Sequence, residues 1–161
     1  MTHKIYITNK PIDKRLNPHL IRRVIKASLA AENVGVPCEV SVLITDDGGI
    51  RAINREFRDL DKPTDVLSFP YFDFTPGEFD INDGKTDEAT GLLPLGDIVL
   101  SAERLVDQAL EYGNTLELET AYLMIHSVLH LLGYDHMDEG ADKQKMRERE
   151  EIILASVKDK K

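Results

Sequence analysis

The feature that most constrains this fold is the segment AYLMIHSVLHLL at positions 121–132, which is apolar on nearly every side. A helix without a polar face must be buried, so we expect this segment to form a helix at the centre of the molecule. It carries His126 and His130, whose spacing of four residues places both imidazoles on one helix face. A buried polar group without a partner costs about 1–3 kcal/mol, so both rings need partners.

A third histidine, His136, follows Gly133, a residue suited to ending a helix in the left-handed conformation. A chain that turns back there can bring His136 to the other two rings. Three neutral imidazoles make a tetrahedral metal site with an open fourth position, as in catalytic zinc centres, although nickel and copper also accept imidazole. The alternative is two core histidines bonded to backbone carbonyls and an unrelated surface His136.

The histidine spacing also matches the metzincin protease motif H-E-x-x-H-x-x-G-x-x-H, including its glycine. Those proteases need a glutamate directly after the first histidine as general base. This chain has Ser127 there, and a serine hydroxyl cannot take a proton from metal-bound water near neutral pH. The sequence therefore predicts a similar metal site without the peptidase chemistry.

The length of 161 residues fits one domain, 1–161, with a substantial core. No apolar run reaches the roughly 18 residues of a membrane span, and the first residues lack a signal-peptide pattern. Cys38 is the single cysteine, so no internal disulfide can form; we expect a small core residue, with a catalytic thiol as the alternative. These features predict a cytoplasmic protein with no membrane association. A net charge of −9 argues against simple coating of nucleic acid, although the first half is the more basic.

Hydrophobic periodicity and turn residues divide the chain into nine elements and one long acidic loop, 73–94. The expected strands are 4–8, 38–45, 66–69 and 96–100, and the expected helices are 18 to about 33, 50–58, 101–113, 114–132 and 139–157. Asn114 with Glu117 suggests a capping box for the histidine helix. We expect the first helix to stop at Gly35, 46–49 to form a turn, and the three apolar residues of 66–69 to lie in the core. The order predicts an α+β (αβα) fold: a small mixed four-stranded sheet packed with helices around the buried metal-bearing helix.

Two stretches of the sequence resemble the bacterial YbeY family of metal-dependent endoribonucleases. HSVLHLLGYDH at 126–136 matches the family pattern H-G-x-L-H-L-x-G-Y-D-H, and NREFRDLDKPTDVLSFP at 54–70 is followed by LGDIVLS at 95–101. The departure is Ser127, where the family usually has glycine. Serine is small, so close packing of the helix is retained.

The resemblance implies an αβα fold, one Zn²⁺ ion held by His126, His130 and His136, and cleavage of single-stranded RNA. It also implies a role in maturation of the 3′ end of 16S ribosomal RNA and in ribosome quality control. The partners it implies are the small ribosomal subunit and, as a further candidate, the assembly GTPase Era.

Arg58 is the predicted catalytic residue outside the metal site. It ends a short helix, and an arginine can bind phosphate through two parallel hydrogen bonds. The resemblance matches it to a functional arginine of the family. The alternative is a surface ion pair with Asp59 or Asp61.

Three further aspartates remain open from sequence. Asp65 and Asp97 are candidate hydrogen-bond acceptors for the ligand histidines, and equally candidate turn caps. Asp135, next to a predicted ligand, could orient His136, act as a base or simply form a turn.

Three functions from different classes fit these observations. The first is a zinc-dependent endoribonuclease, in which the metal polarises a phosphoryl oxygen or supplies hydroxide and Arg58 stabilises the charge on phosphorus. The second is a metzincin-like metallopeptidase or other metallohydrolase, against which Ser127 speaks. The third is a non-catalytic ribosome-assembly factor with a structural metal, although structural zinc is usually held by four ligands and the sequence offers three.

Overall fold

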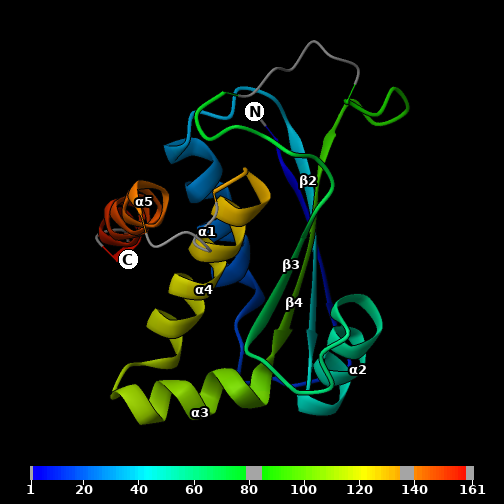
Figure 1. Ribbon diagram of the computed structural model, residues 1–161, viewed down its shortest axis with the longest axis vertical. Helices are drawn as coiled ribbons and strands as arrows, with labels where there is room; N and C mark the ends of the chain where they lie inside the picture. Colours follow the sequence, from blue (N-terminus) through cyan, green and yellow to red (C-terminus); the bar gives the residue numbers. More distant parts are fainter. Residues whose placement is uncertain (1, 79–84, 135–139, 159–161) are drawn as a thin grey trace.

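A four-stranded mixed sheet organises the computed structural model, which describes residues 2–78, 85–134 and 140–158. Its strands lie in the order β1-β2-β4-β3 (Figure 1). Strands β1, β2 and β4 run parallel to one another, and β3 runs antiparallel to β4 at the sheet edge. The strands are β1 Lys4–Asn9, β2 Cys38–Thr45, β3 Val66–Pro70 and β4 Leu93–Ser101. The predicted mixed four-stranded sheet is confirmed.

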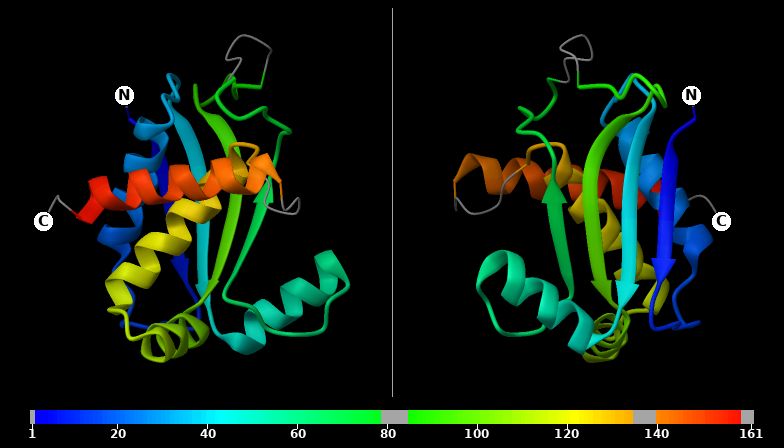
Figure 2. Two further views of the ribbon diagram at one scale, coloured as in Figure 1. Left: turned by 60° about the vertical axis from the view of Figure 1, so that its left-hand side comes forward. Right: turned by 90° about the vertical axis from the view of Figure 1, so that its right-hand side faces the viewer.

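Helices cover both faces of this sheet. The described helices are α1 Pro18–Ala31, α2 Asp47–Arg58, α3 Ala102–Tyr112, α4 Leu116–Leu131 and α5 Ala141–Lys158. In Figures 1 and 2, α1, α4 and α5 lie on one side, α2 lies on the other, and α3 crosses one end of the strands. The main core fills the space between the sheet and α1 and α4, and a smaller cluster under α2 joins Ile50, Leu67 and Val99. The α+β architecture is therefore as predicted.

Helix α4 contains the histidine segment and is the most deeply buried helix of the fold. Most of its positions from Glu119 to Leu131 are buried, and it packs against α1, α3, α5 and β3. The predicted capping box is wrong. Thr115 caps the helix by accepting a hydrogen bond from the Leu118 N–H at 3.1 Å, while Asn114 donates to the Glu119 carboxylate at 2.6 Å.

Two helix boundaries differ from those expected. Helix α1 ends at Ala31, and the left-handed residue after it is Asn33, with φ of 57°, rather than Gly35. Helix α2 begins at Asp47, three residues early, because the Asp46 side chain accepts a hydrogen bond from the Gly49 N–H at 2.8 Å. The residues expected to form a turn are thus a cap and the first helical turn.

Of the three residues expected in the core from β3, Leu67 is buried, whereas Val66 and Phe69 are partly exposed. The reason is that β3 is an edge strand, covered on one side only by its neighbour β4. Nowhere in the described chain is there a helix with both the length and the apolar character needed to cross a membrane.

Gly133 ends α4 as the sequence predicts and also fixes the loop after β3. Its φ is +100°, and the Tyr134 N–H bonds back to the Leu129 carbonyl, as in a Schellman motif. A Cβ atom at this position would lie 1.9 Å from the carbonyl oxygen of Phe74. The loop after β3 therefore rests directly on the end of the histidine helix.

We expect Gly133→Ala to lower the free energy of unfolding by about 2 kcal/mol or more, because it combines a disfavoured backbone conformation with a steric clash. Urea unfolding followed by circular dichroism measures the change. Gly35→Ala is the matched control, since no atom lies within 4 Å of its added Cβ. Equal unfolding midpoints for the two variants would contradict the predicted close contact.

Cys38 is fully buried in the main core, as expected for a small packing residue. Burial raises the pKa of its thiol to about 12, and the Sγ atom lies 3.3 Å from the Val36 carbonyl oxygen. A thiol in this state carries almost no thiolate at neutral pH and cannot act as a nucleophile. The alternative of a catalytic thiol is therefore wrong.

We expect the folded protein to resist a thiol reagent such as dithionitrobenzoate at pH 8, and the protein unfolded in guanidinium to release one equivalent of product. The absorbance of the released thiolate gives both values. Rapid reaction of the folded protein would show that Cys38 is accessible.

Candidate functional site

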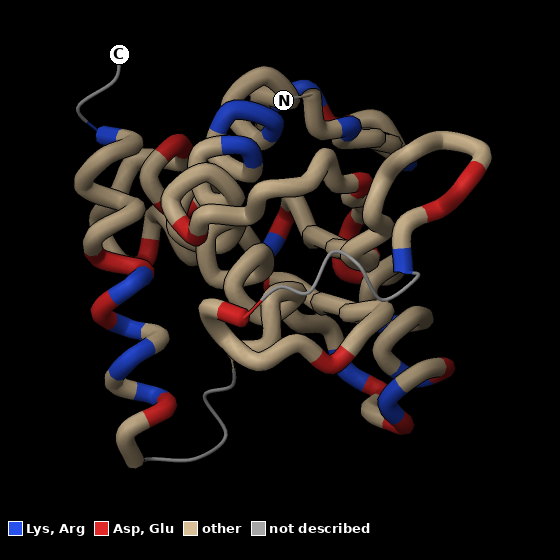
Figure 3. The backbone as a smooth tube through the Cα atoms, turned by 90° about the horizontal axis from the view of Figure 1, so that it is seen from above, with Lys and Arg blue, Asp and Glu red and all other residues tan. Residues whose placement is uncertain are grey.

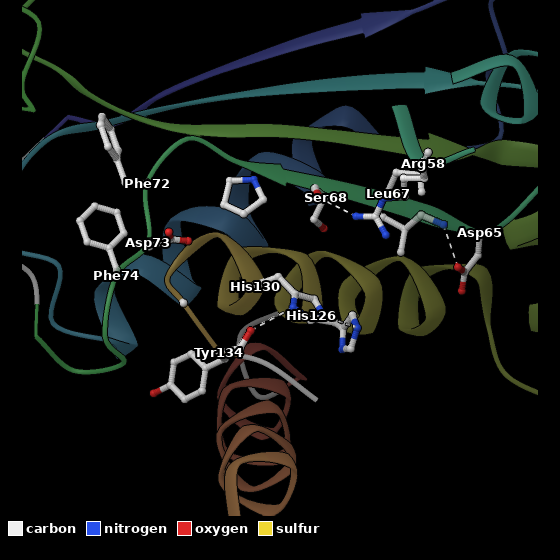
Figure 4. A pocket seen from close by; sticks show the side chains of 13 residues that line it. Arg58, Asp65, Leu67, Ser68, Phe72, Asp73, Phe74, His126, His130 and Tyr134 are labelled. Carbon is white, nitrogen blue, oxygen red and sulfur yellow. Dashed lines mark hydrogen bonds between the residues drawn. The ribbon is translucent and has the colours of Figure 1, made fainter. Parts of the chain in front are cut away.

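A pocket of about 500 Å³ opens between β3 and the second half of α4 (Figure 4). Strand β3 and the loop behind it form one wall, and the end of α4 forms the other. The lining comprises Asp65, Val66, Leu67, Ser68 and Pro70, then Phe72, Asp73 and Phe74 of the loop, Arg58 from α2, and His126, His130, Gly133 and Tyr134. The structure thus brings Arg58 and two of the three predicted ligands to one pocket.

His126 and His130 meet inside this pocket. Their ring centroids are 4.6 Å apart with the planes nearly perpendicular, and their Nε2 atoms are 3.1 Å apart. Both rings are half-buried, whereas most residues between them are fully buried. The helix therefore presents its two polar rings along the stripe that faces the pocket.

The partner of each Nδ1 atom indicates the tautomer of each ring. His130 Nδ1 lies 3.0 Å from the Tyr134 carbonyl oxygen, which can only accept a hydrogen bond. His126 Nδ1 lies 2.6 Å from the Glu150 carboxylate, another acceptor. We infer that both neutral rings carry their proton on Nδ1 and direct the lone pair of Nε2 into the pocket.

Two lone pairs 3.1 Å apart repel each other unless a proton or a cation lies between them. Zinc bound at about 2.0–2.1 Å in tetrahedral geometry separates its nitrogen ligands by roughly 3.3 Å, so the two histidines fit this metal. The alternative of core histidines bonded to carbonyls accounts for His130 Nδ1, whereas His126 Nδ1 faces a carboxylate and the two Nε2 atoms converge in a pocket. The donor set present is thus compatible with a zinc site.

The third predicted ligand, His136, lies outside the described residues. Within the part of the chain that the structure describes, no group of three or more His, Cys, Asp or Glu residues has a metal-binding arrangement. The three-histidine site therefore stays a prediction, supported by the arrangement of His126 and His130.

Arg58 lies at the end of the pocket away from Phe72 and Phe74 (Figure 4). Its Nη2 donates a hydrogen bond to the Ser68 carbonyl oxygen at 3.1 Å, and its guanidinium carbon lies 5.5 Å from the centre of the Phe69 ring. These contacts hold the planar group at the rim of the pocket. They leave the catalytic role of Arg58 a prediction.

The surface ion pair considered for Arg58 takes a different form in the structure. Arg51, about two turns earlier on α2, donates to Asp61 at 2.8 Å. Asp59 adopts the left-handed conformation that ends α2. Arg58 instead donates to the Ser68 carbonyl and lies over the Phe69 ring, and it lines the pocket.

The three aspartates whose roles the sequence left undecided differ in their surroundings. Asp65 lies directly before β3, and its carboxylate accepts from the Val66 N–H at 2.7 Å and from Gln108 at 3.2 Å. Asp97 accepts from the Tyr71 hydroxyl at 3.0 Å and lines a second hollow on the α2 side of the sheet, away from the histidines. Asp135 lies outside the described residues.

Several residues of the site were not identified from sequence. Ser68 lines the pocket because alternate residues of β3 face α4, and Phe72, Asp73 and Phe74 belong to a stretch without periodicity. Glu150 and Tyr134, which bind the histidine Nδ1 atoms, had no local signal. The contact with Glu150 joins positions 24 residues apart in the chain.

Charge near the pocket comes from individual residues and not from a broad basic field. Figure 3 shows Lys and Arg interspersed with Asp and Glu along both α2 and α5. With a net charge of −9, the molecule as a whole repels polyanions. Phosphate binding in this pocket would thus depend on single, well-placed arginines such as Arg58.

Comparison with known proteins gives consistent matches over nearly the whole chain. A family model described as Endoribonuclease YbeY matches residues 4–158. A relative of that name from Clostridium botulinum (strain Hall) is 44% identical over 163 residues, covering 94% of this chain and 96% of the relative. One from Clostridium kluyveri is 43% identical over 168 residues, covering 96% and 94%.

A solved structure also shares the fold. The solution structure of a Thermotoga maritima protein aligns with a TM-score of 0.61 at 24% identity. The alignment covers 95% of this chain and 88% of that chain.

Proposed function

This chain belongs to the Endoribonuclease YbeY family, and from that premise we propose that it is a zinc-dependent endoribonuclease specific for single-stranded RNA. The observation that carries the proposal is the pair of Nε2 atoms 3.1 Å apart, in a pocket of about 500 Å³ that Arg58 also lines. Metal ligands and a phosphate-binding group then lie on opposite walls of one cavity. This arrangement suits phosphodiester cleavage.

His126 and His130 would hold the zinc ion through Nε2, with His136 as the third ligand. Bound zinc supplies a Lewis acid and lowers the pKa of a coordinated water to about 7. The protein's own contribution is to fix the ring orientation and tautomer, with Nδ1 donating to Glu150 or to the Tyr134 carbonyl and Nε2 directed into the pocket. The ring orientation is thereby fixed before substrate arrives.

Arg58 would bind and orient the scissile phosphate. Its fork of N–H donors matches two phosphate oxygens, and charge-assisted hydrogen bonds of this type are among the strong ones. The Phe69 ring and the Ser68 carbonyl hold the guanidinium plane. As negative charge gathers on the phosphoryl oxygens, the fixed positive charge stabilises it.

The shape of the pocket supports a preference for single strands. Phe72 and Phe74 lie at the end opposite Arg58, with ring centroids 5.8 Å apart, and the Lys85 ammonium lies 5.6 Å from the centre of the Phe72 ring. Aromatic rings bind unstacked bases, and a base inside a duplex is not free to reach such rings. A nucleotide whose phosphate contacts Arg58 could place a base at this end.

The metallopeptidase alternative is disfavoured by the edge of the sheet. An extended peptide would bind beside the histidines by adding a strand to β3. In the antiparallel pair of β3 with β4, the odd-numbered positions make the backbone hydrogen bonds, as the flanking bonds of Asp65 with Ser101 and of Tyr71 with Leu95 show. The even-numbered residues of β3 therefore present their backbone groups outward. There, the Val66 N–H is bonded to the Asp65 side chain, the Ser68 carbonyl accepts from Arg58, and Pro70 has no N–H.

Ser127 adds a second argument against peptidase chemistry. Its side chain is fully buried and is not among the residues that line the pocket. A side chain at this buried position, whether serine or a glutamate substituted for it, could not reach a water molecule in the pocket to take its proton unless the packing of the helix changed. The non-catalytic alternative is disfavoured because a structural zinc is enclosed by four ligands, whereas these histidines line an open pocket.

On the family resemblance we further propose maturation of the 3′ end of 16S ribosomal RNA and ribosome quality control as the cellular role. The partners would be the small ribosomal subunit and the assembly GTPase Era, and the place of action the cytoplasm.

His126→Ala should abolish stoichiometric zinc binding and zinc-dependent cleavage of single-stranded RNA, because two imidazoles make a much poorer site than three. Elemental analysis of untagged protein gives the metal content, and a labelled oligonucleotide gives the cleavage rate. His19→Ala is the matched control, since His19 is exposed on α1, away from the pocket. One equivalent of zinc retained by His126→Ala would sink the assignment, as would undiminished cleavage.

Arg58→Lys should reduce cleavage by about tenfold or more while zinc content and melting temperature stay nearly unchanged, because lysine keeps the charge but loses the planar fork. The rate is measured at low salt with RNA below saturation. Arg55→Lys, an exposed position on the same helix, controls for general charge effects. Full activity in Arg58→Lys would rule out the bidentate role.

A further inference from the structure

Helix α5 contributes one buried carboxylate to the site, that of Glu150. The residue is 7% exposed, and its Oε2 atom lies 2.6 Å from His126 Nδ1. Taking a carboxylate out of water costs several kcal/mol unless hydrogen bonds replace its hydration. A carboxylate in this place therefore requires a reason beyond packing.

The pattern of α5 makes the same point. The buried positions of this helix are Met146, Glu150, Ile153 and Val157, which follow the spacing of one helical face. Three of the four are apolar and join the main core. Glu150 occupies the stripe where another apolar side chain would pack, so its charged group is the exception that the contact with His126 explains.

A tyrosine on α4 stacks on the His126 ring and interacts electrostatically with Glu150. Tyr122 lies one turn before His126 on α4, and the two rings stack with centroids 6.0 Å apart. Burial, together with the charge of Glu150 and a hydrogen bond to it, raises the pKa of Tyr122 to about 12. The phenol thus stays protonated at neutral pH and adds no second negative charge beside Glu150.

The neighbouring residue on α5 supports the other histidine through a longer route. Arg149 forms an ion pair with Glu32 at 2.6 Å, and the Tyr134 hydroxyl donates to the same carboxylate. The Tyr134 carbonyl in turn accepts from His130 Nδ1. Consecutive residues of α5 therefore reach both rings, one directly and one through Glu32 and Tyr134.

We propose that Glu150 is a positioning residue that holds His126 in the tautomer protonated on Nδ1, with Nε2 directed into the pocket. The inference rests on the proposed metal site for its purpose, while the contact itself is a feature of the metal-free protein. Its consequence is that docking of α5 sets metal affinity. Partners of this kind typically change metal affinity by about 10–100-fold when they are removed.

The test compares Glu150→Gln with wild type and with Glu151→Gln, an exposed neighbour on the same helix. The glutamine side chain has nearly the same size, but its neutral carbonyl oxygen is a weaker acceptor for the Nδ1 proton than a carboxylate, and its NH2 group can donate to Nδ1 and so stabilise the opposite tautomer. Zinc affinity is measured by competition with a chromophoric chelator, and the tautomer of His126 by ¹⁵N NMR of the metal-free protein. We expect about 10–100-fold weaker zinc binding and a loss of the Nδ1–H tautomer in Glu150→Gln alone.

Glu150→Asp separates contact from charge. It keeps the negative charge but is one methylene shorter, so the carboxylate falls short of Nδ1, and zinc binding should weaken here too. Affinity equal to wild type in Glu150→Asp would overturn the proposed contact. Melting temperatures identify any variant that has lost its fold, and for such a variant the other substitution provides the test.

The NMR measurement distinguishes this inference from the proposed nuclease function. A metal-free wild type whose His126 is protonated on Nε2 overturns the positioning role, whatever the nuclease assay shows. A wild type that has the Nδ1–H tautomer and binds zinc but cleaves no RNA overturns the proposed function and supports the role of Glu150.

Discussion

The burial of α4 is the constraint on which the rest of the structure depends. This helix is apolar on nearly every side, so it needs neighbours all round, and it finds them in α1, α3, α5 and the sheet. Its two histidines are polar, so the stripe of the helix that carries them cannot be packed against apolar neighbours in the same way. The fold resolves the conflict by leaving a pocket along this stripe and by supplying acceptors for Nδ1 from Glu150 and Tyr134. The candidate site is thus the place where burial of the helix is incomplete.

The sheet and helices could be predicted because each has a strong local periodicity. The helix at 121–132 and the strand at 38–45 could be predicted from their own residues, without knowing which elements pack against them. The prediction of the helix start was wrong where two neighbouring residues could each cap the helix. Asn114 and Thr115 are both good caps, and the choice depended on Asn114 finding Glu119 as a partner. Burial of β3 residues was overestimated because a sequence does not show which strand lies at an edge.

The support of the site could not be predicted for a different reason. The roles of Asp65 and Asp97 depend on which neighbours and which face of the sheet each side chain meets, and strand order decides that. The contacts of Glu150 with His126 and of Tyr134 with Glu32 join distant parts of the chain. Helix α5 contains many charged residues, and the sequence does not show which of them is buried. In the structure that residue is Glu150.

The position of the pocket at the sheet edge explains how residues from two layers can line one cavity. The histidines come from the helical layer on one face, and Arg58 comes from α2 on the other. Only β3 separates them, and it is a short strand, Val66–Pro70, whose far side has no further strand in the described sheet. Arg58 can therefore reach around this edge to the Ser68 carbonyl and line the pocket of the histidines. A fifth strand beyond β3 would close that route, so an exposed edge, usually a liability, is here a condition for assembling the site.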